Sequence, residues 1–385
     1  MVLEKRPLVL EVGQIVAGPT AGLILADLGF NVIKVEQPGR GDIARYFTGP
    51  SKGNFAFFNR GKRSITLNLR SAEGREIFLK LVARADVVID NLGYGTMDKL
   101  GLGYQDLVKV NPSIVYLSIK GYGKGPYEDR NALDYPIEVE TGVAYMNGLS
   151  GRPMRLGASI IDMATAMLGI IGVLHALMER ERTGKGAFIR VGLFEAAMFL
   201  MGQHIAAYQA RGNVPLKPMN EEGFAWAIYD FFETADGRKV FIAVTTDAQW
   251  VKFCEALKLP VCGSPEYATN EGRYAHRSEL IPVISKVVSQ INSQDLIKIL
   301  RSNGISYALL NTPWDLLNDE HARNKMVRIN YEGREIVVPY TPIENTLMQP
   351  STKDPPKLSE DTETILLELG YSLSEIENLR RKGVI

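Results

Sequence analysis

The chain has 385 residues, which suggests two or three domains at roughly 150 residues per domain, and its apolar share of 45% is enough to fill a core. Its 44 basic and 44 acidic side chains cancel, which argues against nucleic acid or an anionic membrane as a partner. Cys254 and Cys262 fit neither a disulfide framework nor a four-ligand zinc site, so we expect a reducing compartment and no metal. Because Glu11 interrupts the first apolar run before it could form a signal-peptide core, we predict a cytoplasmic protein.

The first half of the chain alternates short β-branched runs with helical patterns. Strands are expected at 8–12, 32–35, 64–67, 86–90, 114–119 and 187–191, and helices at 19–28, 72–83 and 194–210. This alternation is typical of βαβ units. It predicts an α/β fold in which a mostly parallel sheet carries helices on both faces.

One apolar run, residues 163–178, could be mistaken for a membrane span. Because its 16 residues fall short of the about 20 that a bilayer needs, we expect a helix buried on all sides in a large domain. His175, in the middle of this run, is then expected to be a core residue. The charged turn that follows leads to Gly184, which can end the helix in the left-handed conformation.

Asp162 stands directly before this predicted helix. The position is typical of a structural N-cap, whose carboxylate accepts backbone N–H bonds. The same position would keep a carboxylate ionised and directed out of the helix end, as a nucleophilic aspartate requires. The sequence pattern leaves both interpretations open.

The second half of the chain changes in composition. Residues 212–223 contain two prolines and no apolar period, so they are predicted to be a linker. Runs at 229–234 and 239–244 flank an Asp-Gly turn and predict a hairpin, and helical patterns follow at 248–257, 280–290 and 293–301. We therefore predict a large domain from residues 1–211 and 329–385 and a small α+β domain at 224–328. Two helices near the C-terminus, at 361–369 and 374–382, are expected to pack on the large domain.

An ordered series of short motifs resembles one family, the class III CoA-transferases, which also include the alpha-methylacyl-CoA racemases. The matching runs are Ala17-Gly18-Pro19, Ala26-Asp27-Leu28-Gly29, Val32 to Glu36, Asn59-Arg60-Gly61-Lys62-Arg63-Ser64, Leu100-Gly101-Leu102-Gly103-Tyr104, Gly121-Tyr122-Gly123 and Arg180 to Gly186. The series is dense in the first half of the chain and thin in the second. Its order makes it more specific than any single motif in it.

The resemblance implies a Rossmann-like large domain built from both ends of the chain, with the small domain in between, and an interlocked homodimer. Asp162 falls on the catalytic aspartate of the family. In the transferases this carboxylate attacks an acyl-CoA thioester to give an acyl-aspartyl anhydride and CoA thiolate. The implied partners are an acyl-CoA and a small carboxylic acid, with coenzyme A as substrate and product and with no metal, nucleic acid or membrane.

The same resemblance implies where CoA binds. The matching positions are Gln14, Ile15, Val16, Leu67, Asn91, Leu92, Lys99 and Asn131. Lys99 matches a basic position that faces the nucleotide phosphates, where an ammonium group acts as a point charge. Two departures are noted: Gly93, in the run Asn91-Leu92-Gly93-Tyr94-Gly95, and Gln37 stand where relatives carry arginine. Substrate specificity is expected to lie in the loops 122–131 and 224–229.

Three functions follow as hypotheses. The first is CoA transfer from an acyl-CoA, with succinyl-CoA as the expected donor, to a small carboxylic acid. The second is racemisation of a 2-methylacyl-CoA, which needs a histidine partner for the aspartate; Leu133 stands at that position and cannot carry a proton. Racemisation would then depend on His175 or His204. The third is a non-catalytic CoA-thioester-binding protein in which Asp162 is only a helix cap.

Overall fold

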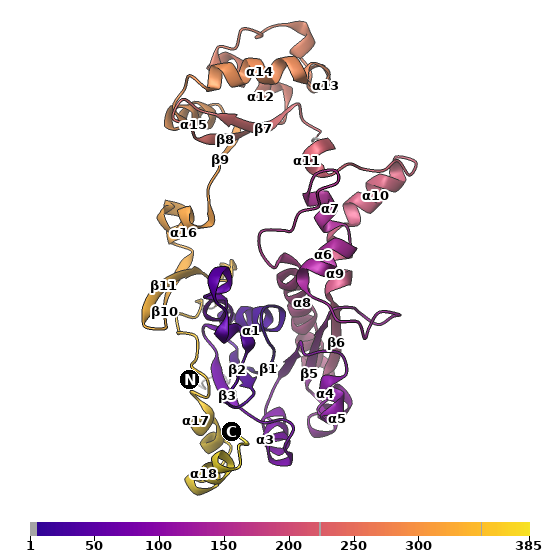
Figure 1. The fold of residues 1–385 in the computed structure, drawn as a ribbon, viewed down its shortest axis with the longest axis vertical. Helices are drawn as coiled ribbons and strands as arrows, with labels where there is room; N and C mark the ends of the chain where they lie inside the picture. The colour runs from indigo at the N-terminus through magenta and orange to yellow at the C-terminus, as the bar shows by residue number, and fades with distance from the viewer. Residues whose placement is uncertain (1–5, 223–224, 348) are drawn as a thin grey trace. The chain divides into compact units, whose positions relative to one another are not determined.

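The computed structural model describes residues 6–222, 225–347 and 349–385, and its ribbon is drawn in Figure 1. The chain divides into two compact units, Met1–Leu216 with Asn324–Ile385 and Lys217–Arg323. Residues 223 and 224, at the predicted end of the linker and start of the small domain, lie outside the described residues. Within the predicted linker a short helix, α11 (Met219–Glu222), forms where we expected none.

A six-stranded parallel sheet lies at the centre of the first unit. Its strands are β1 (Leu8–Val12), β2 (Asn31–Glu36), β3 (Arg63–Thr66), β4 (Val87–Asp90), β5 (Val115–Lys120) and β6 (Ala187–Gly192). Their order in the sheet is β3-β2-β1-β4-β5-β6, with every neighbouring pair parallel. This is the order of doubly wound dinucleotide-binding sheets, in which the direction of winding reverses between β1 and β4. The predicted α/β fold with a parallel sheet is confirmed.

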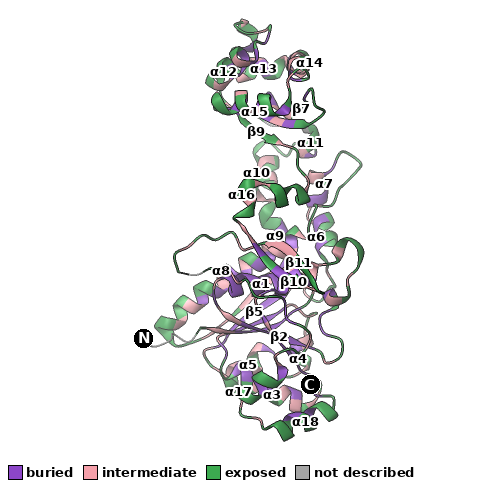
Figure 2. Cartoon of the chain, turned by 90° about the vertical axis from the view of Figure 1, so that its left-hand side faces the viewer, coloured by how far each residue is buried: buried purple, intermediate pink, exposed green. Residues whose placement is uncertain are grey.

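Helices cover both faces of this sheet. They are α1 (Ala17–Asp27), α8 (Ile160–Thr183) and α9 (Leu193–Leu200) on one face, and α3 (Ala72–Val82), α5 (Tyr104–Val110), α17 (Thr362–Glu368) and α18 (Leu373–Arg381) on the other. Successive side chains of a strand point to opposite faces, so Val9 joins the first core and Leu10 the second. Both residues are fully buried, and Figure 2 shows the strands of the sheet buried between the helix layers.

The remaining elements of the first unit are short. They are α2 (Asn54–Asn59), α4 (Thr96–Lys99), α6 (Asp134–Glu140), α7 (Val143–Asn147), α10 (Gly202–Ala210), the 3₁₀ turns η1 (Ile43–Tyr46) and η2 (Gly49–Ser51), and the hairpin β10 (Met326–Tyr331) and β11 (Arg334–Pro339). The single helix predicted at 194–210 is interrupted at Met201 and forms α9 and α10.

Helix α8 departs from the prediction in two ways. It has 24 residues rather than 16, so the argument from length against a membrane span is wrong, and among the described residues it is the one helix long and apolar enough to cross a bilayer. It is also not buried on all sides, because Ile171, Met178 and His175 are exposed. One side nevertheless packs on the sheet, where a Cβ at Gly169 would lie 3.0 Å from Leu117, which favours a core helix. Gly184 ends α8 in the left-handed conformation (φ 69°), as predicted.

The second unit is a small α+β structure. An antiparallel sheet of order β7-β8-β9 is covered by helices. Its elements are β7 (Ile228–Glu233), β8 (Lys239–Val244), α12 (Asp247–Leu257), η3 (Pro265–Tyr267), α13 (Asn270–Ala275), α14 (Arg277–Val288), α15 (Ser293–Ser302), β9 (Ser306–Leu309), η4 (Pro313–Asn318) and α16 (Glu320–Arg323). The hairpin predicted around the Asp-Gly turn is confirmed, with Ile228 opposite Val244.

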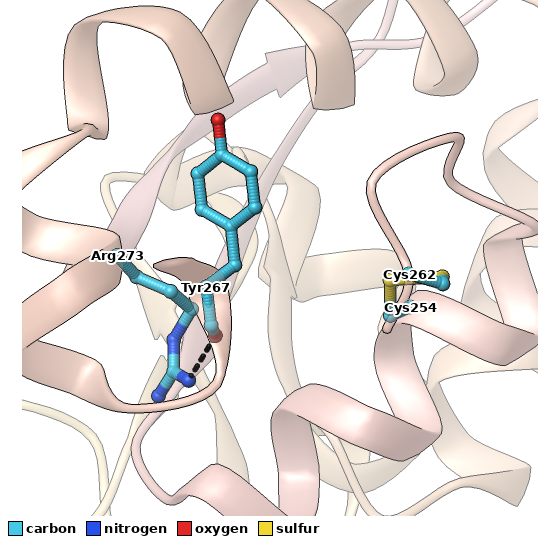
Figure 3. The surroundings of a disulfide bond; sticks show 4 residues. All are labelled: Cys254, Cys262, Tyr267 and Arg273. Atoms are coloured by element: carbon cyan, nitrogen blue, oxygen red, sulfur yellow. Dashed lines mark hydrogen bonds between the residues drawn. A yellow bond between two sulfur atoms is a disulfide. The ribbon is translucent and has the colours of Figure 1, made fainter. Parts of the chain in front are cut away.

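The two cysteines form a disulfide bond, which corrects the expectation that they would not pair (Figure 3). Cys254 lies in the last turns of α12 and Cys262 in the turn that follows, so the reversal of the chain brings their Cα atoms to 5.6 Å. Lys258 makes this reversal possible in the left-handed conformation (φ 52°). The bond also removes the cysteine argument for a reducing compartment, and the cytoplasmic location stays a prediction.

Candidate functional site

The turn after β1 adopts a conformation that its residues do not favour. Ile15 has a φ of 70°, in the left-handed region that β-branched residues avoid. The carboxylate of Asp42 accepts its N–H group at 3.1 Å. Asn91, which follows β4, accepts the N–H of Gln14 at 2.8 Å and donates to its carbonyl at 2.9 Å. Strain of this kind persists only where neighbours hold it, and it concentrates at functional sites.

This turn lies where a parallel sheet binds ligands. β1 and β4 are adjacent strands at which the winding reverses, and the crevice beyond their carboxyl ends is the usual ligand site. Helix α1 begins directly after the turn, and no side chain caps its first N–H groups. A Cβ at Gly18 would lie 3.0 Å from the side chain of Asn91, so only glycine allows the helix to approach this closely.

A cluster of buried charges supports the turn from behind. Glu11 bridges two lysines, with 2.8 Å to Lys34 Nζ and 2.5 Å to Lys62 Nζ, and none of these side chains is exposed. Lys34 also binds Asp42 at 2.9 Å and the carbonyl of Gly13 at 2.9 Å. Burial lowers the pKa of Lys62 to about 8, although Glu11 opposes the shift. The turn is thus fixed by ion pairs that water does not reach.

A cleft of about 370 Å³ opens beside this turn and brings most of the predicted site residues together. Its lining contains Asp162 and the predicted CoA-binding residues Gln14, Ile15, Val16, Asn91, Leu92 and Asn131. Leu67 lines a neighbouring cleft of about 230 Å³ instead. Gln14 and Leu92 line both clefts, so the two clefts are adjacent at these residues.

Lys99 lines neither cleft. It is exposed at the end of α4, whose first residue, Thr96, lines the smaller cleft. Lys99 directly precedes Leu100, which also lines this cleft, and its assignment to the nucleotide phosphates stays a prediction.

Asp162 lies inside α8, which corrects its placement as the N-cap. The helix begins at Ile160 after Ser159, so Asp162 occupies the first turn. Its backbone N–H donates to Asp134 Oδ2 at 3.0 Å. Burial first, and then the negative charge of Asp134, raises the pKa of the Asp162 carboxyl to about 7, so it is only partly ionised at neutral pH, contrary to the expectation that the helix end would keep it ionised.

No histidine joins Asp162 in this cleft. Leu133 lines it, at the position where the racemases carry histidine. His175 lies thirteen residues further along α8, about 20 Å at 1.5 Å per residue, and it is exposed rather than in the core. Neither His175 nor His204 is among the described residues that line the cleft.

Other lining residues were not selected from the sequence. They are Tyr94, Lys120, Glu128, Arg130 and Asp134. Lys120 is occupied by Asp90 at 2.6 Å, whereas the guanidinium of Arg130 stacks on the rings of Tyr122 and Tyr127. Their only sequence signal is their place near the carboxyl ends of two strands: Tyr94 follows β4, and the other four lie between the last residue of β5 and the first residue of α6. Over the described ranges, no group of three or more His, Cys, Asp or Glu side chains is arranged to hold a metal ion.

Comparison with known proteins identifies relatives along nearly the whole chain. The model of CoA-transferase family III matches residues 7–362. A succinyl-CoA:mesaconate CoA-transferase of Haloarcula marismortui is 34% identical over 94% of both chains. The alpha subunit of a succinyl-CoA–L-malate CoA-transferase of Chloroflexus aurantiacus is 33% identical over 99% of this chain and 93% of its own. A succinate–glutarate CoA-transferase of Agrobacterium fabrum is 32% identical over 94% of both.

Solved structures share the fold. A CAIB/BAIF family protein from Brucella suis superposes with a TM-score of 0.84 and 34% identity, covering 94% of this chain and 98% of its own. Rv3272 from M. tuberculosis superposes with a TM-score of 0.81 and 28% identity, covering 93% and 97%.

Proposed function

This chain belongs to CoA-transferase family III, and we propose that it transfers CoA from an acyl-CoA thioester to a small carboxylic acid, with Asp162 as the nucleophile. The observation that carries this proposal is the cleft at the strand-order reversal, where Asp162 and most of the expected CoA contacts meet. The names of the relatives support succinyl-CoA as donor and a dicarboxylic acid as acceptor.

The proposed reaction needs no external proton. Ionised Asp162 attacks the thioester carbonyl, the C–S bond breaks, and an acyl-aspartyl anhydride and CoA thiolate result. The thiolate then attacks the aspartyl carbonyl and expels the donor acid, leaving an aspartyl-CoA thioester. The acceptor carboxylate attacks the aspartyl-CoA thioester, which gives a second anhydride and releases CoA thiolate again. The thiolate then attacks the acyl carbonyl of the acceptor, which forms the new acyl-CoA and restores the Asp162 carboxylate. The uncapped N–H groups of α1 support stabilisation of the oxyanions.

The two adjacent clefts support the placement of CoA. We assign the thioester end to the larger cleft beside Asp162 and the rest of CoA to the smaller cleft past Gln14 and Leu92. Leu67, which lines the smaller cleft, then contacts CoA away from the reacting atoms. No histidine is among the described residues that line the cleft with Asp162, which favours transfer over racemisation.

Mass spectrometry tests the proposed reaction. Purified protein is incubated with succinyl-CoA and a pool of small carboxylic acids, and new CoA thioesters are sought. We expect the wild type to form them and Asp162→Ala not to, while Glu255→Gln, at an exposed position of α12, retains the activity. Exchange by Asp162→Ala at the wild-type rate would refute the role of Asp162. Incorporation of solvent deuterium at the α-carbon without exchange would establish racemisation instead.

We also propose that two copies of the chain associate through the exposed side of α8. Ile171 and Met178 on this side are 64% and 71% exposed, and a soluble chain seldom leaves such a row of apolar side chains in water. Light scattering should report a dimer, and Ile171→Glu should dissociate it. Leu373→Glu, at an equally exposed leucine on α18, is the matched control. A monomeric wild type would refute the proposal.

A further inference from the structure

Two carboxyl groups lie behind Asp162 on one side of helix α6. Asp134 and Glu138 are four residues apart, so their Cβ atoms are neighbours at about 5–6 Å. Asp134 is 5% exposed and Glu138 is not exposed at all. Like charges at this spacing repel, and burial strengthens the repulsion because water no longer screens it. The pair therefore needs a compensating contact.

Each carboxyl group has one oxygen bound to a backbone N–H. Asp162 donates to Asp134 Oδ2 at 3.0 Å, and Leu156 donates to Glu138 Oε2 at 2.9 Å. The second oxygens, Asp134 Oδ1 and Glu138 Oε1, are buried, and no described donor reaches them. At the i,i+4 spacing on α6, these two unpaired oxygens can contact each other in a hydrogen bond. Between two carboxyl groups such a contact requires a proton.

The charged groups that face Asp134 and Glu138 do not replace the proton as the compensating contact. Arg155 is the facing cation, and its Nη2 lies 3.8 Å from Asp134 Oδ1, too far for a direct hydrogen bond. Its side chain is 52% exposed, so water weakens its effect. Asp162, on α8, adds a third carboxyl group. Full ionisation would place three negative charges against one positive charge that water screens.

We propose that Asp134 and Glu138 share a single proton, and that this proton makes Asp134 a positioning residue for the nucleophile. With the proton on the Glu138 side, Asp134 accepts from Glu138 through Oδ1 and from the Asp162 N–H through Oδ2. The first turn of α8 is then held where Asp162 faces the cleft. The catalytic part of this inference rests on the proposed function, whereas the shared proton does not.

The proposal implies a loss of activity at alkaline pH. Burial raises the pKa of Glu138 to about 7, with Asp134 adding to the shift, so the pair loses its proton above neutrality. Two adjacent carboxylates then repel, and Asp134 no longer stays on the Asp162 N–H. We expect kcat/KM to fall about tenfold per pH unit on this limb, whereas ionisation of Asp162 produces the rise on the acid side.

The variant Glu138→Gln tests the role of the proton separately from the role of the hydrogen bonds. The glutamine amide can donate to Asp134 and accept from Leu156 as protonated Glu138 does, but it has no proton to lose. The variant should retain activity at pH 7 and lose the alkaline limb. Should Glu138→Gln fail to fold, Asp134→Asn takes its place in the infrared experiment described next. The asparagine amide donates to an ionised Glu138, so the signal of a protonated carboxyl group is again expected to disappear.

Infrared spectroscopy detects the proton directly, without turnover. In the Asp162→Asn background, where residue 162 cannot contribute, the free protein at pH 6 should show a protonated-carboxyl band that Glu138→Gln and Asp134→Asn both remove. Glu140→Gln, on the same helix, is the control, because hydrogen bonds from Tyr122 and Arg130 lower the pKa of Glu140 and keep it ionised.

Each outcome decides one part of the inference. A band that persists in both variants would overturn the shared proton. Loss of the band with an unchanged alkaline limb in Glu138→Gln would overturn the positioning role. Exchange by Asp162→Ala would overturn the proposed function, while the infrared result would still decide the pair.

Discussion

Replacing Asp162 by asparagine should stabilise the protein at alkaline pH while abolishing transfer. The pKa of Asp162 rises from 3.8 to about 7 on folding, because burial and Asp134 disfavour the ionised form. A carboxyl group with a raised pKa stabilises the folded state when protonated, and this contribution is lost between about pH 4 and 7. A shift of about three units corresponds to about 4 kcal/mol at 1.36 kcal/mol per unit. Asparagine does not ionise and avoids this loss.

Urea unfolding of both proteins at two pH values measures the effect. Asp162→Asn should exceed the wild type by about 2–4 kcal/mol at pH 8.5, and the difference should shrink to about 1 kcal/mol at pH 4.5. The titration of Glu138 is common to both proteins and cancels. Asp129→Asn, in an exposed loop, should change the unfolding free energy by less than about 0.5 kcal/mol at either pH. A variant no more stable than the wild type at pH 8.5 would show that Asp162 is not held in a disfavoured ionisation state.

Three further variants test other parts of the structure. Glu11→Gln leaves two buried lysines without their shared carboxylate and should cost about 3–5 kcal/mol in urea unfolding. Glu73→Gln, which breaks an exposed ion pair with Lys382, should cost much less, and equal costs would contradict the buried cluster. Asn91→Ala removes both hydrogen bonds to Gln14 and should raise KM for the acyl-CoA about tenfold, with a smaller effect on kcat. An unchanged KM would show that the turn after β1 keeps its conformation without Asn91. Cys262→Ser opens a short loop and should lower the unfolding free energy by about 2–3 kcal/mol, whereas alkylation of the unfolded wild type without reductant would show that the bond is not formed.

Local patterns were sufficient to predict the central sheet. Strand β1 lies at the predicted residues, because buried parallel strands consist of continuous apolar runs bounded by polar residues. The hairpin of β10 and β11 was missed in a proline-rich segment. Its turn uses Glu332 and Gly333, both with positive φ, and Pro339 is tolerated at the end of an edge strand. Proline there marks a strand end, which composition alone does not distinguish from a loop.

The site required information that no local pattern contains. Asp162 was selected through the family resemblance, and the helix pattern predicted a helix start at residue 163, three residues later than the observed start at Ile160. Asp134 acts on Asp162 from 28 residues away, and Asp42 holds Ile15 from 27 residues away. Such contacts arise only when the sheet assembles. The strain at Ile15 was equally invisible, since isoleucine is a residue that sequence rules would not assign to φ 70°.

The two walls of the cleft differ in how freely they could change over evolution. The wall after β1 is backbone held by Asp42 and Asn91, so most substitutions around it would disturb buried charges. The opposite wall consists of loop side chains that are exposed, among them Asn131 and Leu133. Selection for a new substrate could therefore act on residues 128–133 at little cost in folding. A library confined to these positions is the economical route to altered selectivity.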